Sequence, residues 1–191
     1  MEQPIGVGVL GLGSIGTSRA RAPKQHSKQA RLVASSGGNP ERAAEAGWPD
    51  ADQISPTDIS THPGVDVVAI CSPSDQHGVQ AIEALQAGKH VVVAKPLALT
   101  VAEAERIVAL ANDGGRVLSV ISQRRLEPEY AAVKEMLTSG QLGQVRLATT
   151  HVHWWRDADY YAAAPWRSQM DAGGGSVMNQ GVHKVVPHGV V

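Results

Sequence analysis

The 191-residue sequence has few or none of several residue types, and each of these absences excludes some classes of protein. It contains no phenylalanine and one cysteine, Cys71. A single cysteine cannot form a disulfide within the chain, so a disulfide-stabilised secreted scaffold is excluded and a reducing compartment is expected. The composition therefore predicts a cytoplasmic protein.

The chain also lacks an excess of charge of either sign and any long apolar run. With 17 Lys and Arg against 18 Asp and Glu, its formal net charge is −1. So small a charge does not attract nucleic acid or an anionic membrane. No segment approaches the roughly 20 apolar residues of a membrane helix, and residues 1–13 lack the basic region of a signal peptide. We therefore expect a small-molecule partner, with no nucleic acid and no membrane.

What the sequence does contain is an alternation of short Val- and Ile-rich runs with Ala-rich stretches of helical length. This alternation is typical of a parallel sheet covered by helices on both faces. The predicted strands are Ile5–Leu10, Arg31–Ser35, Val65–Cys71, His90–Val93 and Arg116–Ile121. The predicted helices are Ser14–Ala22, Glu41–Ala46, His77–Ala87 and Val101–Asn112. The pattern predicts an α/β fold, a Rossmann-type doubly wound parallel sheet, over residues 1–122.

The pattern changes after residue 122. Residues 128–139 read as one amphipathic helix, and residues 145–154 alternate as a strand with one exposed face would. Five of the seven aromatic residues then fall between Trp154 and Trp166, where they either stack on a sugar ring or, as we expect, form core. We predict that residues 123–191 are a partial α+β domain for substrate binding and oligomerisation.

A glycine-rich turn follows the first predicted strand. Gly11 permits a sharp turn into the next helix, Gly13 lets the backbone approach a pyrophosphate, and Gly16 lets helix and strand pack closely. The amides at the start of the helix, at Ser14 and Ile15, then face the negative charge of the ligand. The turn predicts dinucleotide binding, and the alternative is a glycine-rich turn without a ligand.

The end of the second predicted strand bears on the choice of dinucleotide. An NAD-specific fold places an acidic residue there for the ribose hydroxyls, but no carboxylate occurs between Glu2 and Glu41. Ser36 and Arg42 could instead donate hydrogen bonds to a 2′-phosphate. NADP is therefore favoured over NAD, which stays possible, and the alternative is that the basic residues here are solvated surface.

Several longer segments resemble the Gfo/Idh/MocA family of oxidoreductases over nearly the whole chain. They are Gly-Leu-Gly-Ser-Ile-Gly at 11–16, Asn-Pro-Glu-Arg-Ala at 39–43, Val-Asp-Val-Val-Ala-Ile-Cys-Ser-Pro-Ser-Asp-Gln-His at 65–77, Ala-Gly-Lys-His-Val-Val-Val-Ala-Lys-Pro-Leu at 87–97, Pro-Trp-Arg at 165–167 and Gly-Gly-Gly-Ser-Val-Met-Asn-Gln-Gly-Val-His at 173–183. The resemblance implies an NAD(P)-dependent dehydrogenase or reductase that acts on sugars, polyols or related cyclic alcohols and ketones. It also implies a homo-oligomer.

The resemblance implies roles for particular residues. Ser72, Pro73 and His77 would lie along the cofactor. Lys95, which matches the Lys of the family's Glu-Lys-Pro signature, would lie between the nicotinamide and the substrate hydroxyl. An ammonium at that place can polarise a carbonyl, although the alternative is a surface lysine at a strand end.

His183 matches the position at which the family often carries its general base. Imidazole titrates near neutral pH and can take the hydroxyl proton when the carbinol carbon loses hydride. The partner four residues earlier is Asn179 in place of an acid, and an amide can orient but cannot relay a proton. The alternative is a helix-start histidine without a catalytic task.

Other candidates carry weaker signals. Arg124, Arg125 and Arg167 could contact an anionic substrate or the cofactor, or lie on the surface. His151 and His153 would share one face of a strand, but no third ligand is evident, and no metal site is expected.

Three departures from the family pattern stand out. Ala94 replaces the Glu of the signature, and Val186 stands where the family usually has an Asp. The chain also ends eight residues after His183, whereas the family continues through most of an open, largely antiparallel sheet, and residues 184–191 do not resemble the apolar helix expected there. We therefore expect a truncated or frameshifted product that diverges just after His183, and the alternative function is a nucleotide-binding remnant without turnover.

Overall fold

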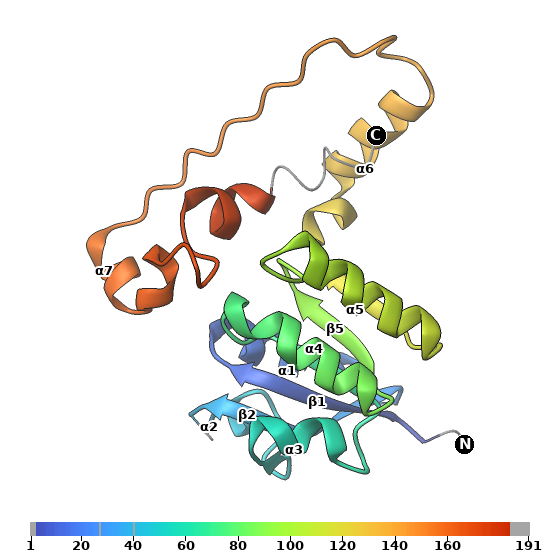
Figure 1. The fold of residues 1–191 in the computed structure, drawn as a ribbon, viewed down its shortest axis with the longest axis vertical. Helices are drawn as coiled ribbons and strands as arrows, with labels where there is room; N and C mark the ends of the chain where they lie inside the picture. The colour runs from blue at the N-terminus through green and yellow to red at the C-terminus, as the bar shows by residue number, and fades with distance from the viewer. Residues whose placement is uncertain (1–2, 27, 40, 184–191) are drawn as a thin grey trace. The chain divides into compact units, whose positions relative to one another are not determined.

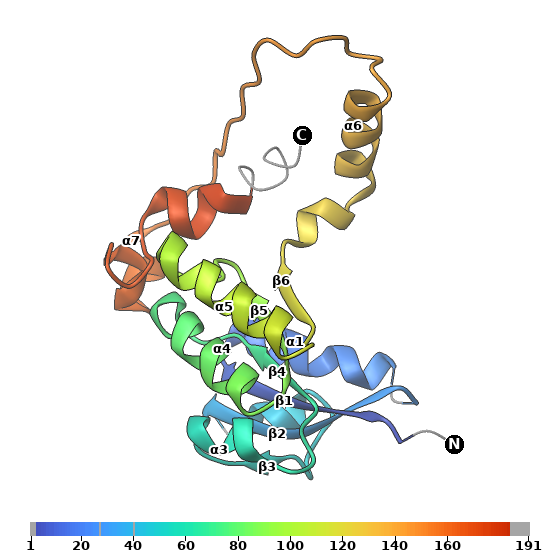
Figure 2. The same cartoon turned by 45° about the vertical axis from the view of Figure 1, so that its right-hand side comes forward.

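The computed structural model of the chain describes residues 3–26, 28–39 and 41–183. It divides into two compact units, residues 1–120 and 121–191, and each is considered by itself. Figures 1 and 2 show the first unit in blue to yellow-green and the second in yellow to red. The segment 184–191, where a departure from the family was predicted, lies outside the described residues.

The first unit is built on a six-stranded sheet with the order β3-β2-β1-β4-β5-β6. The strands are β1 Ile5–Leu12, β2 Ala30–Gly38, β3 Asp52–Gln53, β4 Val67–Ile70, β5 His90–Ala94 and β6 Leu118–Ile121. The pairs β1–β2, β1–β4, β2–β3 and β4–β5 are parallel. The predicted Rossmann-type doubly wound sheet is confirmed. The sequence missed β3, because two residues are too few to show an alternation.

Helices cover both faces of this sheet. They are α1 Ser14–Gln25, α2 Glu41–Glu45, α3 Pro56–Thr61, α4 His77–Gln86 and α5 Val101–Asp113. Successive strand residues face opposite ways. Leu10 of β1 therefore packs in one core cluster with Ile59, Leu85 and Ile107 from α3, α4 and α5. Val9 packs in the other cluster with residues of α1 and α2.

The starts of two helices are fixed by side chains that accept a backbone hydrogen bond. The hydroxyl of Thr100 accepts from the Glu103 amide at 3.2 Å and begins α5, and the Thr-x-x-Glu spacing of these residues is that of a capping box. Ser55 does the same for Asp58 at 3.3 Å and begins α3. The six-residue helix α3 was not predicted, because so short a helix shows less than two turns of periodicity.

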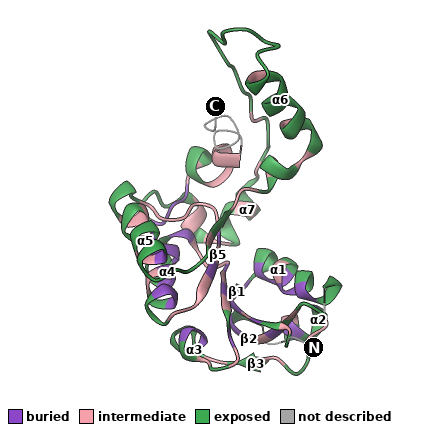
Figure 3. Ribbon diagram, turned by 90° about the vertical axis from the view of Figure 1, so that its right-hand side faces the viewer, coloured by how far each residue is buried: buried purple, intermediate pink, exposed green. Residues whose placement is uncertain are grey.

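The second unit has little regular structure and few buried side chains. Its elements are the short helix η2 Gln123–Leu126, α6 Pro128–Thr138, α7 Ala158–Ala162, η3 Pro165–Ser168 and the π-helical η4 Ser176–Gly181. Figure 3 shows α6 and the segment after it as almost wholly exposed, whereas buried residues gather on the sheet and helices of the first unit.

The predicted strand over residues 145–154 is wrong. This segment carries no strand assignment. A strand needs a neighbour to pair its backbone amides and carbonyls, and no strand runs beside it among the described residues of its unit. Alternation of side chains along the chain is therefore not sufficient to form one.

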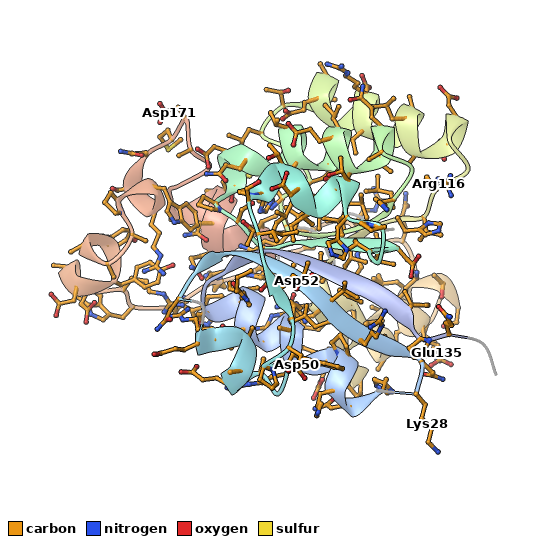
Figure 4. All side chains as sticks on the ribbon, turned by 90° about the horizontal axis from the view of Figure 1, so that it is seen from below. Lys28, Asp50, Asp52, Arg116, Glu135 and Asp171 are labelled. Atoms are coloured by element: carbon orange, nitrogen blue, oxygen red, sulfur yellow. The ribbon has the colours of Figure 1, made fainter. Side chains whose placement is uncertain are left out.

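Lys28 and Arg116 of the first unit lie at its surface (Figure 4). Within the described part of the chain, no helix has both the length and the apolar character to cross a bilayer.

Gly13 and Gly16 of the β1–α1 turn differ in how much space there is for a side chain. A Cβ added at Gly16 would overlap the carbonyl oxygen of Gly11, whereas a Cβ at Gly13 would meet nothing within 4 Å. We predict that Gly16→Ala lowers the free energy of unfolding by about 2 kcal/mol or more, because the backbone must shift. Urea unfolding should show this loss, and Gly13→Ala is the matched control, with a change below about 1 kcal/mol. Equal stability of the two variants would contradict the packing role of Gly16.

Candidate functional site

The candidate site of the first unit lies at the edge of the sheet where β1 and β4 end. The chain order reverses between these neighbours, because β2 lies on one side of β1 and β4 on the other. In open α/β sheets the crevice at such a switch point receives the ligand. Because β1, β2, β4 and β5 are parallel, the turns that follow them all lie at this edge.

The turn after β1 touches the end of β4. Gly11 has a φ of +85°, and a Cβ there would lie 2.6 Å from the backbone nitrogen of Ser72. Only glycine combines this left-handed conformation with this close approach. Gly11 and Gly16 therefore pack as the sequence predicted, and they hold the turn directly over the end of β4.

The same turn leaves room for a ligand at the start of α1. Gly13, Ser14 and Ile15 are exposed, and nothing stands within 4 Å of the place of a Gly13 side chain. The first intrahelical bond of α1 runs from the Thr17 amide to the Gly13 carbonyl at 2.9 Å, so the preceding amides have no partner within the helix. This open backbone cradle fits the pyrophosphate of a dinucleotide.

The end of β2 carries the predicted ribose-binding residues. Ser36 is 3% exposed, so its side chain is buried. The next residue, Gly37, is exposed with a φ of +74°. Arg42 reaches from α2 to the glycine turn, where its Nη1 donates to the carbonyl of Leu12 at 3.1 Å. Of the two predicted residues, Arg42 is therefore the one that places charge beside the turn.

The turn after β4 is held by polar side chains. The Ser72 hydroxyl donates to Gln80 of α4 at 2.6 Å, and Pro73 is the residue before the short helix η1 Ser74–Gln76. The ring of His77 is 1% exposed. Its Nδ1 lies 2.6 Å from the carbonyl oxygen of Pro96 and its Nε2 lies 2.9 Å from that of Ser72.

His77 therefore joins the turn after β4 to the turn after β5, and its ring nitrogens are engaged by the protein itself. The sequence did not indicate this bridge, because Ser72, His77 and Pro96 come from three places along the chain. Gln80 was also missed, although it follows His77 by one helical turn.

We predict that His77→Leu lowers the free energy of unfolding by about 2–4 kcal/mol, because a buried backbone carbonyl loses its imidazole N–H donor and a close-packed ring is replaced. Urea unfolding measures this loss. The exposed His26 is the matched control, and His26→Leu should change stability by less than about 0.5 kcal/mol. If both variants unfold alike, the bridge contributes no stability.

Lys95 follows β5 directly, and the peptide bond that joins it to Pro96 is cis. Burial lowers the pKa of Lys95 from 10.5 to about 8, because desolvation disfavours the charged ammonium. Near neutral pH the group is therefore a cation that can lose its proton readily. Such a group can polarise a carbonyl and stabilise a developing alkoxide.

Cys71, at the end of β4, has the opposite character. Burial raises the pKa of its thiol to about 11, against a smaller opposing effect of Arg19. The only cysteine of the chain is therefore a packed thiol, and thiolate chemistry is not expected from it.

The lowered pKa of Lys95 predicts a pH dependence of stability. The folded chain releases this proton near pH 8 and the unfolded chain near pH 10.5, so Lys95 destabilises the fold most below pH 8. Relative to Lys95→Met, the native chain should therefore gain stability as pH rises from 8 to 10.5. Urea unfolding of both proteins across this range checks the sign, and a constant difference would contradict it.

In the second unit, the two predicted residues of the general-base pair contact two different aromatic side chains. The Asn179 amide nitrogen donates to the hydroxyl of Tyr160 at 3.3 Å. The ring of His183 lies 6.2 Å from that of Trp154 between centroids. Asn179 and His183 belong to the second unit, whereas Lys95 belongs to the first.

The sequence predicted that the aromatic residues of this unit form a buried core, and this prediction is wrong. Trp155 is 86% exposed and Trp154 is 38% exposed. Tyr160 instead interacts with arginine and amide side chains, and its partners Arg156 and Gln180 were not predicted from the sequence. His151 and His153 lie edge to face, 5.5 Å apart between centroids, and no group of three potential metal ligands occurs among the described residues.

The doubly wound sheet, the packed glycine turn and the open start of α1 define a dinucleotide-binding protein of the Rossmann class. Residues 5–122 match the family model of an oxidoreductase family with an NAD-binding Rossmann fold, and residues 130–186 match the GFO/IDH/MocA C-terminal domain. The chain belongs to the Gfo/Idh/MocA family.

Among its relatives is the uncharacterized oxidoreductase YdgJ of Escherichia coli, which is 34% identical over 92% of this chain and 50% of its own length. Inositol 2-dehydrogenase 1 of Saccharopolyspora erythraea is 37% identical over 72% of this chain and 42% of its own length. The matched region thus spans about half the length of these two relatives.

Solved structures agree with these matches. The WlbA dehydrogenase from Bordetella pertussis, in complex with NADH and UDP-GlcNAcA, has a TM-score of 0.88 and 35% identity, over 97% of this chain and 54% of its own. Relatives include scyllo-inositol 2-dehydrogenases of Bacillus subtilis of both the NADP(+) and the NAD(+) kind. Family membership therefore does not decide the cofactor.

Proposed function

We propose that this chain is an NAD(P)-dependent oxidoreductase that acts on a sugar, a polyol or a related cyclic alcohol or ketone. The observation that carries the proposal is the open backbone cradle at Gly13 and the start of α1, at the same sheet edge as Lys95. The names of the relatives support it, since they include inositol dehydrogenases and a dehydrogenase of a sugar nucleotide. A cytoplasmic location stays a prediction, as does a homo-oligomer.

The residues of the first unit would bind the cofactor and orient the reacting oxygen. The amides at Gly13, Ser14 and Ile15 would receive the pyrophosphate, since the start of a helix favours negative charge. A bound nicotinamide supplies or accepts the hydride. Lys95 would donate a hydrogen bond to the substrate oxygen and stabilise its developing negative charge.

The second unit would supply the proton transfer. His183 would take the hydroxyl proton during oxidation and return it during reduction, while Asn179 would orient the substrate. Because Asn179 cannot titrate, the imidazole alone would carry the proton in this pair.

For the cofactor, we propose that NADPH binds more tightly than NADH. No carboxylate stands between Glu2 and Glu41 to repel a 2′-phosphate, and Arg42 already lies beside the turn. Ser36 remains a proposed contact, but its burial argues for contact through the backbone more than through the hydroxyl.

Fluorescence titration with NADPH and NADH tests the binding, and we predict that Arg42→Gln weakens NADPH about tenfold more than NADH. Arg21→Gln, at an exposed position of α1, is the matched control with an unchanged preference. A preference that Arg42→Gln does not alter would contradict the ribose-phosphate contact. Failure of both cofactors to bind at millimolar concentration would overturn the proposed function.

Turnover is tested by cofactor absorbance across a panel of polyols, sugars and their acids. Lys95→Ala should abolish the reaction and leave cofactor affinity within a few-fold, because the side chain acts on the substrate oxygen. Full activity of this variant would refute the role of Lys95. Tight cofactor binding without turnover on any substrate would support the alternative, a nucleotide-binding chain that does not catalyse.

A further inference from the structure

Two arginine side chains of the second unit flank one aromatic ring. The guanidinium carbon of Arg167 lies 4.1 Å from the ring centroid of Tyr160, and that of Arg156 lies 5.1 Å from it. All three residues are half-buried. Two positive charges are therefore held against the same ring, where partial desolvation makes their repulsion stronger than in water.

No carboxylate neutralises these two charges within the described part of this unit. Arg156 donates to the backbone oxygen of Trp155 at 2.9 Å and to the side-chain oxygen of Gln180 at 3.4 Å. Arg167 donates to the backbone oxygen of Tyr160. All these acceptors are neutral, so both guanidinium groups keep their full charge and most of their N–H donors stay available.

Two acidic side chains of this unit are engaged by other groups. Asp157 caps α7 by accepting from the Tyr160 amide at 2.9 Å. Glu127 pairs with Arg124 at 2.9 Å. Arg124 therefore has a counter-ion, whereas Arg156 and Arg167 form no ion pair with any described residue of the unit.

The hydroxyl of Tyr160 adds a further donor to this cluster. It accepts from the side-chain amides of Gln180 at 2.8 Å and Asn179 at 3.3 Å. A phenol oxygen that accepts two hydrogen bonds has its own hydrogen left to donate. No acceptor for that hydrogen occurs among the described residues of the unit. The Tyr160 hydroxyl hydrogen is therefore available to an acceptor that binds beside the ring.

We propose that Arg156, Arg167 and the Tyr160 hydroxyl form a subsite for an oxyanion of the substrate, a carboxylate or a phosphate. The subsite makes this chain specific for acidic or phosphorylated sugars over neutral polyols. The proposal rests on the proposed function for the sugar part of the substrate. Planar guanidinium groups bind such oxyanions through paired hydrogen bonds.

The test is equilibrium binding of four sugars to the whole chain, followed by NMR of the arginine side chains. Glucuronate and glucose 6-phosphate carry the two kinds of oxyanion, and glucose and myo-inositol carry none. We expect at least one charged sugar to bind about tenfold more tightly than both neutral ones. The charged sugar that binds more tightly identifies the oxyanion. It should also shift the Nε–Hε signals of Arg156 and Arg167.

Variants separate binding from folding. Arg156→Gln and Arg167→Gln should each remove most of the preference for the charged sugar, whereas Arg167→Lys should keep part of it, since the charge remains. Arg146→Gln, at an exposed position of the same unit, is the matched control with an unchanged preference. Circular dichroism establishes that each variant stays folded.

Equal binding of charged and neutral sugars would overturn the subsite, as would a preference that survives the Arg156→Gln/Arg167→Gln double variant. Absence of any sugar binding at millimolar concentration would overturn it too. None of these measurements needs hydride transfer. A preference for the charged sugar in a chain without turnover would therefore contradict the proposed function and leave the subsite standing.

Discussion

The approach of the glycine turn to the end of β4 is the constraint on which the first unit depends. Gly11 lies against the backbone of Ser72, and Gly16 lies against Gly11. No side chain fits at either place, so helix α1 begins close to the sheet edge. That position leaves the amides at the start of α1 directed at the crevice, and the rest of the candidate site is arranged around them.

The turns at this edge are tied to one another by side chains that come from distant parts of the chain. Arg42 reaches the carbonyl of Leu12 from α2, and His77 links the carbonyls of Ser72 and Pro96. Lys95 is the neighbour of Pro96, so the buried imidazole fixes the backbone that carries the proposed catalytic amine. Side chains that bind backbone carbonyls, such as His77, thus position the residues that would contact the ligands, such as Lys95.

The two units are stabilised by different kinds of contact. In the first unit, alternating strand residues pack into two hydrophobic clusters on opposite faces of the sheet. In the second, arginine, tyrosine and amide side chains contact one another while much of the backbone has no regular partner. Such a cluster is organised by charge and hydrogen bonding, and that makes it suitable for recognising a charged ligand.

The sequence by itself determined much of the local structure of the first unit: the order of the longer strands and helices, the glycine turn and the cap at Thr100. Each depends on short-range periodicity or on backbone geometry that a few residues specify. Only the tertiary structure decided that Ser36 is buried, that His77 bridges two turns and that residues 145–154 form no strand. It also decided that Arg156 and Arg167 share the ring of Tyr160. These facts depend on which distant groups meet, because burial, strand pairing and charge compensation are properties of the packed chain and leave no periodic signal along it.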